Sequence, residues 1–235
     1  MLRDSDDGRS LREYLIATAA RLIDQRGSAG LAVRDIAREA QVADGVLYNY
    51  FEDKEDLLTR ALLAHVGAVM ADMRPMPPPG SGTVAGNLRQ FIGAGLATLA
   101  RVAPAFAGLL AQPKVLTRFH DMVGGARAFG VDTEDDGEPP PTSPAPFMAA
   151  PEGHGGGGLP AILRAYLTAE QQLGRIDAAA DIEAAVSLVV GAIHGQVLPQ
   201  VMFSPPGTQL AWPPDLPGRL ADTVLSGIAP VRPQA

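Results

Sequence analysis

Residues 33–58 read VRDIAREAQVADGVLYNYFEDKEDLL, and this stretch decides the fold. Apolar residues recur at helical spacing over 33–40 and again over 44–51, with a short polar break between the two segments. A further helical segment begins at Lys54, where Asp53 is placed to cap its first turn. Two short helices joined by a tight turn, with a longer helix behind them, predict a helix-turn-helix unit.

The segment 44–51 divides into two faces when it is wound at about 100° per residue. The inward face carries Val46, Leu47, Tyr50 and Phe51. The outward face is small and polar and carries Asp44, Gly45, Tyr48 and Asn49. A helix of this kind fits the major groove of DNA, because no bulky side chain blocks the approach of its backbone.

Several side chains of this unit have the chemistry of DNA contacts. Asn49 is able to donate and accept at a base edge, and the Tyr48 hydroxyl is able to reach a phosphate. Arg34 and Lys54 lie in first helical turns, where a cation and the helix N-terminus together attract phosphate. The predicted DNA-binding set is Arg34, Ala43, Asp44, Gly45, Tyr48, Asn49, Tyr50 and Lys54.

Most of these residues also have an ordinary structural interpretation. Tyr50 is equally suited to the core with its hydroxyl left in water, and Phe51 is assigned to the core outright. Asn49 and Arg34 are also typical of a solvated surface. Lys54 is also placed to pair with a neighbouring carboxylate, Glu55 or Asp56.

Residues 10–74 resemble the DNA-binding domain of TetR-type transcriptional repressors. The spacing Gly45-x-Leu-Tyr-x-Tyr-Phe-x-x-Lys-x-x-Leu-Leu is much more specific than a generic helix-turn-helix pattern. The resemblance implies that 44–51 is the recognition helix and that Tyr48, Tyr50 and Lys54 touch the DNA backbone. The matching positions are Ala17, Ala20, Leu22, Gly27, Val33, Ile36, Ala37, Ala40, Val42, Gly45, Leu47, Tyr48, Tyr50, Phe51, Lys54, Leu57 and Leu58.

The chain departs from the family pattern at four positions. Ala32 and Ala43 stand where the family usually has a capping Thr and a capping Ser. Gln41 replaces the usual turn glycine, and Val46 replaces a common Thr. Each change removes a cap or a phosphate contact. Asp44 adds a carboxylate that phosphates repel, unless it accepts a hydrogen bond from a cytosine amine.

Helical periodicity continues through the rest of the chain, and no alternating strand pattern is present. The predicted fold is therefore all-α. The resemblance implies a three-helix helix-turn-helix DNA-binding domain over 10–74 and a helical effector-binding and dimerisation domain over 83–229. The Pro- and Gly-rich joint PMPPPGSG at 75–82 separates the two units. The segment 130–158, rich in Pro, Gly and acidic residues, is predicted to be a flexible loop. Further helices are predicted at about 10–26, 54–74, 83–102, 104–123, 159–173, 178–198 and 215–228. In the first of them, Ser10 and Glu13 are placed to form a capping box, and Gly27 is placed to end the helix in a left-handed conformation.

The segment 181–195, DIEAAVSLVVGAIHG, is the part of the second unit that most resembles the same family. The resemblance implies that this helix and the last helix form a four-helix interface with a second copy. The alternative is that it is simply a buried core helix. A homodimer would set two recognition helices about one turn of DNA apart and would imply a near-palindromic operator. The predicted interface residues are Ile182, Ala185, Val186, Val189, Ile193 and Val197.

The resemblance also implies an effector pocket between the C-terminal helices. The alternative for every candidate lining residue is ordinary core packing, which is the default for apolar residues at helical spacing. Their apolar character favours a hydrophobic or amphipathic effector. The candidates are Phe91, Phe106, Phe119, Met122, Tyr166 and His194.

Composition narrows the class of protein. The net charge of the 235 residues is −7, and residues 10–74 hold 8 Lys and Arg against 10 Asp and Glu. Any DNA contact must then come from a small local surface rather than a basic field. Cysteine is absent, so disulfides and thiolate metal sites are excluded, and no cofactor is predicted. No secretory signal or membrane span is apparent, which favours a cytoplasmic protein.

No catalytic constellation is present, so the chain is not predicted to be an enzyme. The histidines, His65, His120, His154 and His194, form no metal-binding pair, and no Gly-x-Ser-x-Gly elbow occurs. The predicted function is a homodimeric, ligand-responsive repressor whose partners are double-stranded operator DNA and a small-molecule effector. The rival is a helical small-molecule binding or scaffold protein whose N-terminal unit no longer binds DNA, as Asp44, the lost caps and the negative charge would suggest.

Overall fold

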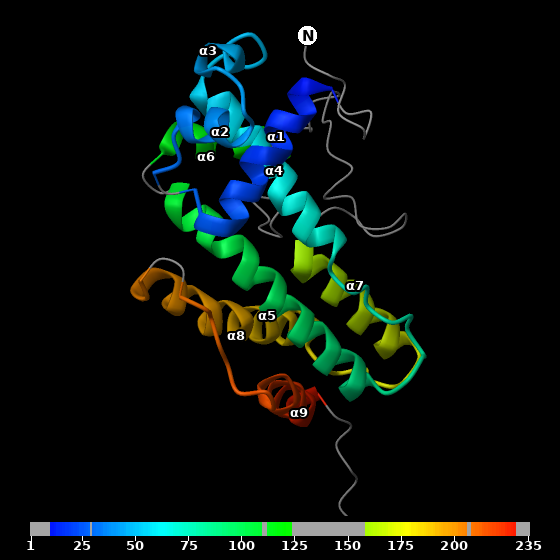
Figure 1. Ribbon diagram of the computed structural model, residues 1–235. Helices are drawn as coiled ribbons and strands as arrows, with labels where there is room; N and C mark the ends of the chain where they lie inside the picture. The colour runs from blue at the N-terminus through cyan, green and yellow to red at the C-terminus, as the bar shows by residue number, and fades with distance from the viewer. Residues whose placement is uncertain (1–9, 29, 110–111, 124–157, 206–207, 229–235) are drawn as a thin grey trace, which may run out of the picture.

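The computed structural model describes residues 10–28, 30–109, 112–123, 158–205 and 208–228 (Figure 1). These residues form helices and no strand, which confirms the all-α prediction. Most of the predicted loop 130–158, including His154, lies outside the described residues. The helices are α1 (Leu11–Arg26), α2 (Val33–Glu39), α3 (Asp44–Leu47), α4 (Lys54–Ala71), α5 (Val84–Leu109), α6 (Pro113–Val123), α7 (Gly158–Gln172), α8 (Ile182–Phe203) and α9 (Leu216–Ile228).

The N-terminal helices begin where capping residues stop the preceding chain. Ser10 and Glu13 form the predicted capping box on α1, in which each side chain accepts a hydrogen bond from the other's backbone N–H. Gly27 ends α1 with a φ of 71°, a left-handed value that suits glycine. Asp53 caps α4 by accepting from the Asp56 N–H at 2.7 Å. These sequence predictions are confirmed.

The prediction that α5 ends before Pro104 is wrong. One helix runs from Val84 to Leu109 with Pro104 inside it, and the next begins at Pro113. A proline within a helix removes one N–H and pushes the carbonyls of the preceding turn away from the helix axis. One of those carbonyls, that of Arg101, accepts a hydrogen bond from Nε2 of His65 on α4 at 3.1 Å. Tertiary contact thus compensates for part of what the proline costs.

Two hydrophobic clusters form the interior. The first joins α1, α2, α3 and α4 to α6 and to the C-terminal part of α5. The second joins the rest of α5 to α7, α8 and α9. Figure 1 shows α5 running through the middle of the molecule, with α3 near one end and α9 near the other. The predicted boundary at 75–82 stays a prediction, and α6 packs with the helices that precede that joint in the chain.

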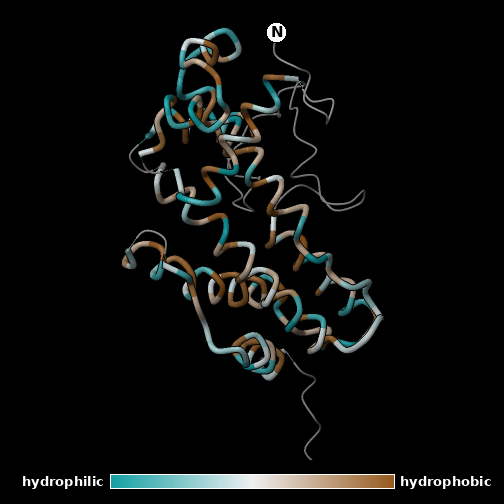
Figure 2. The backbone as a smooth tube through the Cα atoms, in the orientation of Figure 1, coloured by the Kyte–Doolittle hydropathy of each residue, from teal (hydrophilic) through white to brown (hydrophobic). Residues whose placement is uncertain are grey.

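By length and hydropathy alone, α5 and α8 would each suffice to cross a membrane. In this structure both helices contribute buried side chains to the second cluster. Figure 2 shows apolar residues along much of α8, which therefore has more apolar surface than one packing face requires.

Candidate functional site

The predicted recognition helix is shorter than expected, but the backbone continues to wind beyond its last α-helical residue. The α-helical part, α3, ends at Leu47, and residues 48–50 continue as a turn. The N–H groups of Asn49 and Tyr50 donate to the carbonyls three residues earlier, at 3.1 and 3.0 Å. Such bonds tighten the last turn of a helix without redirecting its side chains.

The two faces of this segment lie as predicted, with Tyr50 the exception. Leu47 and Phe51 are buried, and Arg12 lies over the Phe51 ring at 5.5 Å. Tyr50 is 39% exposed and so is only partly packed. Tyr48 is 61% exposed, the most open of the tyrosines that carry the motif. The rest of the outer face is exposed and consists of Ala43, Asp44, Gly45 and Asn49.

Two cations lie in the first turns of the helices on either side of α3 in the chain. Arg34 is exposed in the first turn of α2, and Lys54 is half-buried in the first turn of α4. Asp56, one of the two partners considered for Lys54, instead pairs with Arg60 at 2.6 Å. Within the described residues, no ion pair engages either Arg34 or Lys54. Both charges remain available to an external anion.

Arg118 of α6 is a residue that the sequence analysis missed. Its guanidinium makes two hydrogen bonds to the Asp53 carboxylate, at 2.6 and 2.9 Å. These bonds, together with the Asp56 N–H, lower the pKa of Asp53 below its ordinary value. Asp53 therefore caps the helix that carries Lys54 and at the same time ties it to α6. The two partners are 65 residues apart, so no local pattern announces their contact.

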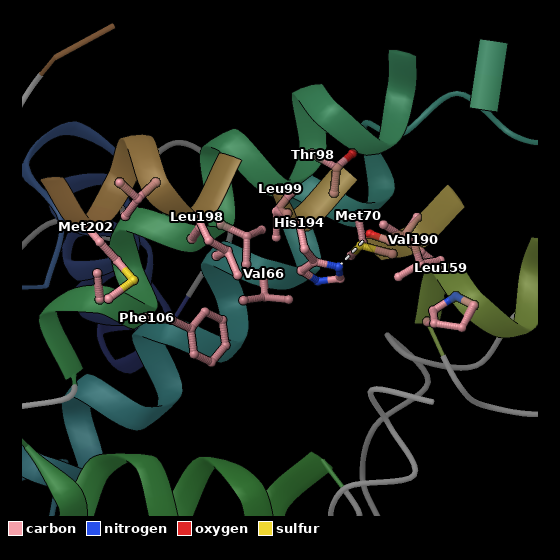
Figure 3. Close-up of a pocket in the computed structure, with 16 residues that line it drawn as sticks. Val66, Met70, Thr98, Leu99, Phe106, Leu159, Val190, His194, Leu198 and Met202 are labelled. Carbon is pink, nitrogen blue, oxygen red and sulfur yellow. Dashed lines mark hydrogen bonds between the residues drawn. The ribbon is translucent and has the colours of Figure 1, made fainter. Parts of the chain in front are cut away.

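A cavity of about 480 Å³ lies further along α4, next to Val66 and Met70. Its walls come from α4, α5, the first turn of α7, and α8 (Figure 3). A volume of this size is typical of sites for small organic ligands. The lining residues are Val66, Met70, Thr98, Leu99, Val102, Ala103, Phe106, Ala107, Gly158, Leu159, Pro160, Val190, His194, Leu198, Val201 and Met202.

Of the six predicted pocket residues, Phe106 and His194 line the cavity. Phe119 is buried in the first cluster, where its ring meets Phe106 edge-on at 5.1 Å. Phe91 and Tyr166 are buried in the second cluster, and Met122 is half-buried on α6. Aliphatic side chains of α4 and α8, which carry no distinctive sequence signal, supply much of the remaining wall.

His194 is the most polar feature of the cavity wall. Its Nδ1 lies 2.8 Å from the Val190 carbonyl oxygen, and a carbonyl only accepts, so Nδ1 carries the proton and donates. Figure 3 shows the ring held by this bond among Val66, Met70 and Val190. In the neutral ring the other nitrogen, Nε2, is then an acceptor.

The structure places the predicted dimer residues inside the chain itself. Ala185, Val186, Val189, Ile193 and Val197 are buried in the second cluster, and Ile182 packs against it. A different face of α8 stays open, with Leu188 and Met202 each 64% exposed. This open stripe has spacings of four and three residues and consists of Ala184, Leu188, Gly191, Gly195, Leu198 and Met202. An amphipathic pattern in the sequence identifies the apolar face of a helix. When a helix is apolar on two faces, as α8 is, only the structure shows which face packs inside the chain and which stays exposed.

A buried polar cluster fixes the end of the predicted joint at 75–82. The Glu170 side chain of α7 is fully buried, accepts from the Gly80 N–H at 3.2 Å and pairs with Arg175 at 3.2 Å. Arg175 also donates to the Gly82 carbonyl at 2.7 Å. The pKa of Tyr166 is raised to about 12, chiefly because the hydroxyl is buried and secondly because it lies beside the Glu170 carboxylate. Residues 80–82 are thus fastened to α7 and to the chain just beyond it.

Comparison with known proteins identifies the N-terminal unit. Residues 15–61 match the family described as "Bacterial regulatory proteins, tetR family". The HTH-type transcriptional regulator HbdR of Aromatoleum sp. (strain CIB) is 40% identical over 47 residues. That match spans 20% of this chain and 20% of the relative. The N-terminal unit is a TetR-family domain.

The TetR-type fold extends over most of the chain. FadR from Bacillus subtilis, solved in complex with stearoyl-CoA, is similar with a TM-score of 0.53 and 21% identity, covering 92% of this chain and 98% of that chain. A TetR family regulator from Pseudomonas syringae pv. tomato str. DC3000 gives a TM-score of 0.54 at 16% identity, covering 94% and 95%. The resemblance seen in the sequence is thereby confirmed as a shared fold.

The departures of this TetR-type domain from the family pattern have visible consequences. Neither Ala32 nor Ala43 provides a side-chain cap, although Asp35 accepts from the Ala32 N–H at 3.1 Å and so supplies half of a capping box. Gln41 occupies the left-handed region with a φ of 58°. In the part of the chain that the structure describes, no group of His, Asp and Glu is arranged to hold a metal ion.

Proposed function

We propose that this protein is a ligand-responsive transcriptional regulator, in the form of a homodimeric repressor that binds a near-palindromic operator in the cytoplasm. A small hydrophobic effector binds in the cavity and releases the DNA. One observation carries the proposal: α4 bears Lys54 at its N-terminus and lines the cavity with Val66 and Met70 further along. A ligand that displaces α4 therefore acts directly on the phosphate-binding end of the same helix.

The exposed side of the TetR-type domain supports DNA binding. Tyr48 and Asn49 project from the turn after α3, and no atom would lie within 4 Å of a Cβ built on Gly45. At Gly45, the surface proposed to face the groove therefore carries no bulky side chain, which lets the backbone approach the bases. Arg34 and Lys54 supply local positive charge on a unit whose balance is negative.

The open stripe of α8 supports a homodimer. A Cβ placed on Gly191 or Gly195 would meet nothing within 4 Å, so the surface at these glycines is open. A second copy of α8 related by a two-fold axis would cover the same stripe on both chains. This proposal replaces the predicted interface residues by the open stripe and keeps the predicted helix.

The character of the cavity supports a hydrophobic effector. Its walls are almost wholly aliphatic or aromatic. Bacillus subtilis FadR, which has the same fold, was solved with stearoyl-CoA, a ligand with a long hydrocarbon chain. No catalytic reaction forms part of the proposal.

Binding to DNA that flanks the protein's own gene tests the regulator function. We expect tight binding to one near-palindrome, and a Tyr48→Ala, Lys54→Ala variant that binds at least about tenfold more weakly. Loss of Lys54 alone should reduce the slope of log affinity against log salt by about one. Arg219→Ala, which removes an exposed cation from α9, is the matched control and should bind like the wild type. Equal binding by the double variant and the control would favour the scaffold rival.

A pair of neighbouring substitutions tests the dimer. Gly191→Leu adds bulk to the open stripe and should weaken dimerisation by about tenfold or more while leaving the fold intact. Val189→Ala removes buried volume two residues away and should instead lower the free energy of unfolding by about 1–3 kcal/mol. Analytical ultracentrifugation and urea denaturation separate the two effects. A Gly191→Leu protein that dimerises like the wild type would exclude the stripe as the interface.

A further inference from the structure

Among the residues that the structure describes, the lining of the cavity is uncharged as well as apolar. Of its 16 lining residues none is Lys, Arg, Asp or Glu, and only Thr98 and His194 carry polar side chains. A carboxylate, a phosphate or an ammonium placed there would lose its water and gain no opposite charge. The walls therefore select against ionised ligands as firmly as they accept hydrocarbon.

Cations do occur nearby, but on the other side of α5. A separate hollow is bordered by Arg74, Arg89 and Arg101, and it shares only Thr98 with the apolar cavity. Arg101 is moreover paired with Asp72 at 2.9 Å. Thr98 itself is buried, so its side chain forms part of the partition between the two spaces. Arg74, Arg89 and Arg101 thus lie outside the cavity in which the hydrocarbon part of a ligand would lie.

His194 gives the cavity one directional polar contact. The Val190 carbonyl fixes the proton on Nδ1, which leaves Nε2 of the neutral ring as an acceptor. Among the described residues, no hydrogen bond engages this Nε2. An acceptor in an apolar wall is best matched by a ligand that brings an uncharged donor, such as a hydroxyl group.

We infer that the effector is an uncharged lipophile carrying a hydroxyl group, or another neutral hydrogen-bond donor, that bonds to Nε2 of His194. This inference rests on the proposed function, because it takes the cavity to be the effector site. It distinguishes the protein from regulators of free fatty acids or of acyl-CoA thioesters. Ligand size is set by the aliphatic walls, and ligand class is set by the missing charges and by His194.

Direct calorimetric titration of the DNA-free full-length protein tests the ligand class. The probes share one chain length and differ in the head group: dodecan-1-ol, dodecanoate, dodecyltrimethylammonium and dodecanoyl-CoA, all below their micellar concentrations. We expect the alcohol to bind at least about tenfold more tightly than each charged probe. Equal or tighter binding by any charged probe would overturn the inference.

The role of His194 is tested with the methyl ether of dodecan-1-ol, which lacks the hydroxyl proton. In the wild type the alcohol should bind about five- to tenfold more tightly than the ether. His194→Phe keeps the ring volume and should abolish this difference by weakening the alcohol alone. A preference for the alcohol that survives in His194→Phe would overturn the assigned contact.

Ala107→Phe places a ring in the cavity and locates the bound ligand without altering His194. It should weaken the alcohol and the ether alike, and unaltered binding would overturn the assignment to this cavity. The proposed regulator function and the proposed ligand class can be rejected separately. Operator release by dodecanoyl-CoA but not by the alcohol would leave the regulator function standing and reject the ligand class. Alcohol binding in the cavity without any operator binding would do the reverse.

Discussion

Gln41 holds the turn between α2 and α3 in a conformation that suits glycine. Its φ of 58° lies in the left-handed region, which costs a residue with a side chain about 1–2 kcal/mol. Gln41→Gly should therefore raise the free energy of unfolding by about 1 kcal/mol, after allowance for the greater freedom of glycine in the unfolded chain. Urea denaturation measures the change. Gln41→Ala is the control, and a gain of equal size from alanine would show that the strain is not the cause.

The Asp53–Arg118 pair makes stability depend on pH in the acid range. The folded state lowers the pKa of Asp53, so the unfolded chain takes up a proton first as the pH falls. The stabilisation is therefore full above the ordinary carboxyl pKa of 3.8 and is lost as the pH falls below that value. The difference in unfolding free energy between the wild type and Arg118→Met should stay constant from about pH 7 to 5 and shrink towards pH 3.

Both groups of this pair are well exposed, so the difference at neutral pH is expected to be modest. Arg219→Met, which removes a more exposed pair on α9, is the matched control and should show less dependence on pH. A difference for Arg118→Met that persists undiminished at pH 3 would mean that the arginine stabilises by packing rather than by its charge.

At the scale of the helices, the sequence predicted the helix ends best where neighbouring residues determine them. The caps Ser10 and Asp53 and the stop at Gly27 each act within a few residues, and all three were predicted. The continuation of α5 through Pro104 was not, because the bond from His65 to the Arg101 carbonyl joins residues 36 apart.

The candidate site shows the same division between local and distant causes. The exposed set around Tyr48 follows from winding one short segment, and the structure places it as predicted, with Tyr50 only partly packed. The cavity walls, the Asp53–Arg118 pair and the choice between two apolar faces of α8 depend on which helices meet. Periodicity says that a helix has an apolar face, but it does not say whether α5 or a second copy covers that face.

The predicted joint over 75–82 is held in place by hydrogen bonds from Gly80 to Glu170 and from Arg175 to Gly82. Glu170 is fully buried, and Arg175 is its cationic partner. Arg175→Met leaves that carboxylate without its counter-charge and should lower the free energy of unfolding by about 2–4 kcal/mol. Adding Glu170→Gln to the same protein removes the buried charge and should restore part of the loss. Urea denaturation of the three proteins decides it, since a double variant less stable than Arg175→Met would show that the charge is not the problem.

At the scale of the whole molecule, α4 connects the two proposed binding sites. Its N-terminus bears Lys54, Asp53 ties that end to α6, and Val66 and Met70 line the cavity. If one arrangement of α4 favours DNA and another favours the effector, the two ligands compete through the protein without sharing a site. Linkage then requires operator DNA to weaken effector binding by the same factor by which the effector weakens operator binding.

We expect this factor to be about 10–100. Calorimetric titration of an effector into the free protein and into the operator complex measures one direction, and operator titration with and without the effector measures the other. The Tyr48→Ala, Lys54→Ala variant supplies the control, because it should keep the effector affinity of the free protein whether or not DNA is present. If the weakening of operator binding instead keeps growing in proportion to the effector concentration and never levels off at a fixed factor, the effector competes directly at the DNA-binding face and coupling through α4 is excluded.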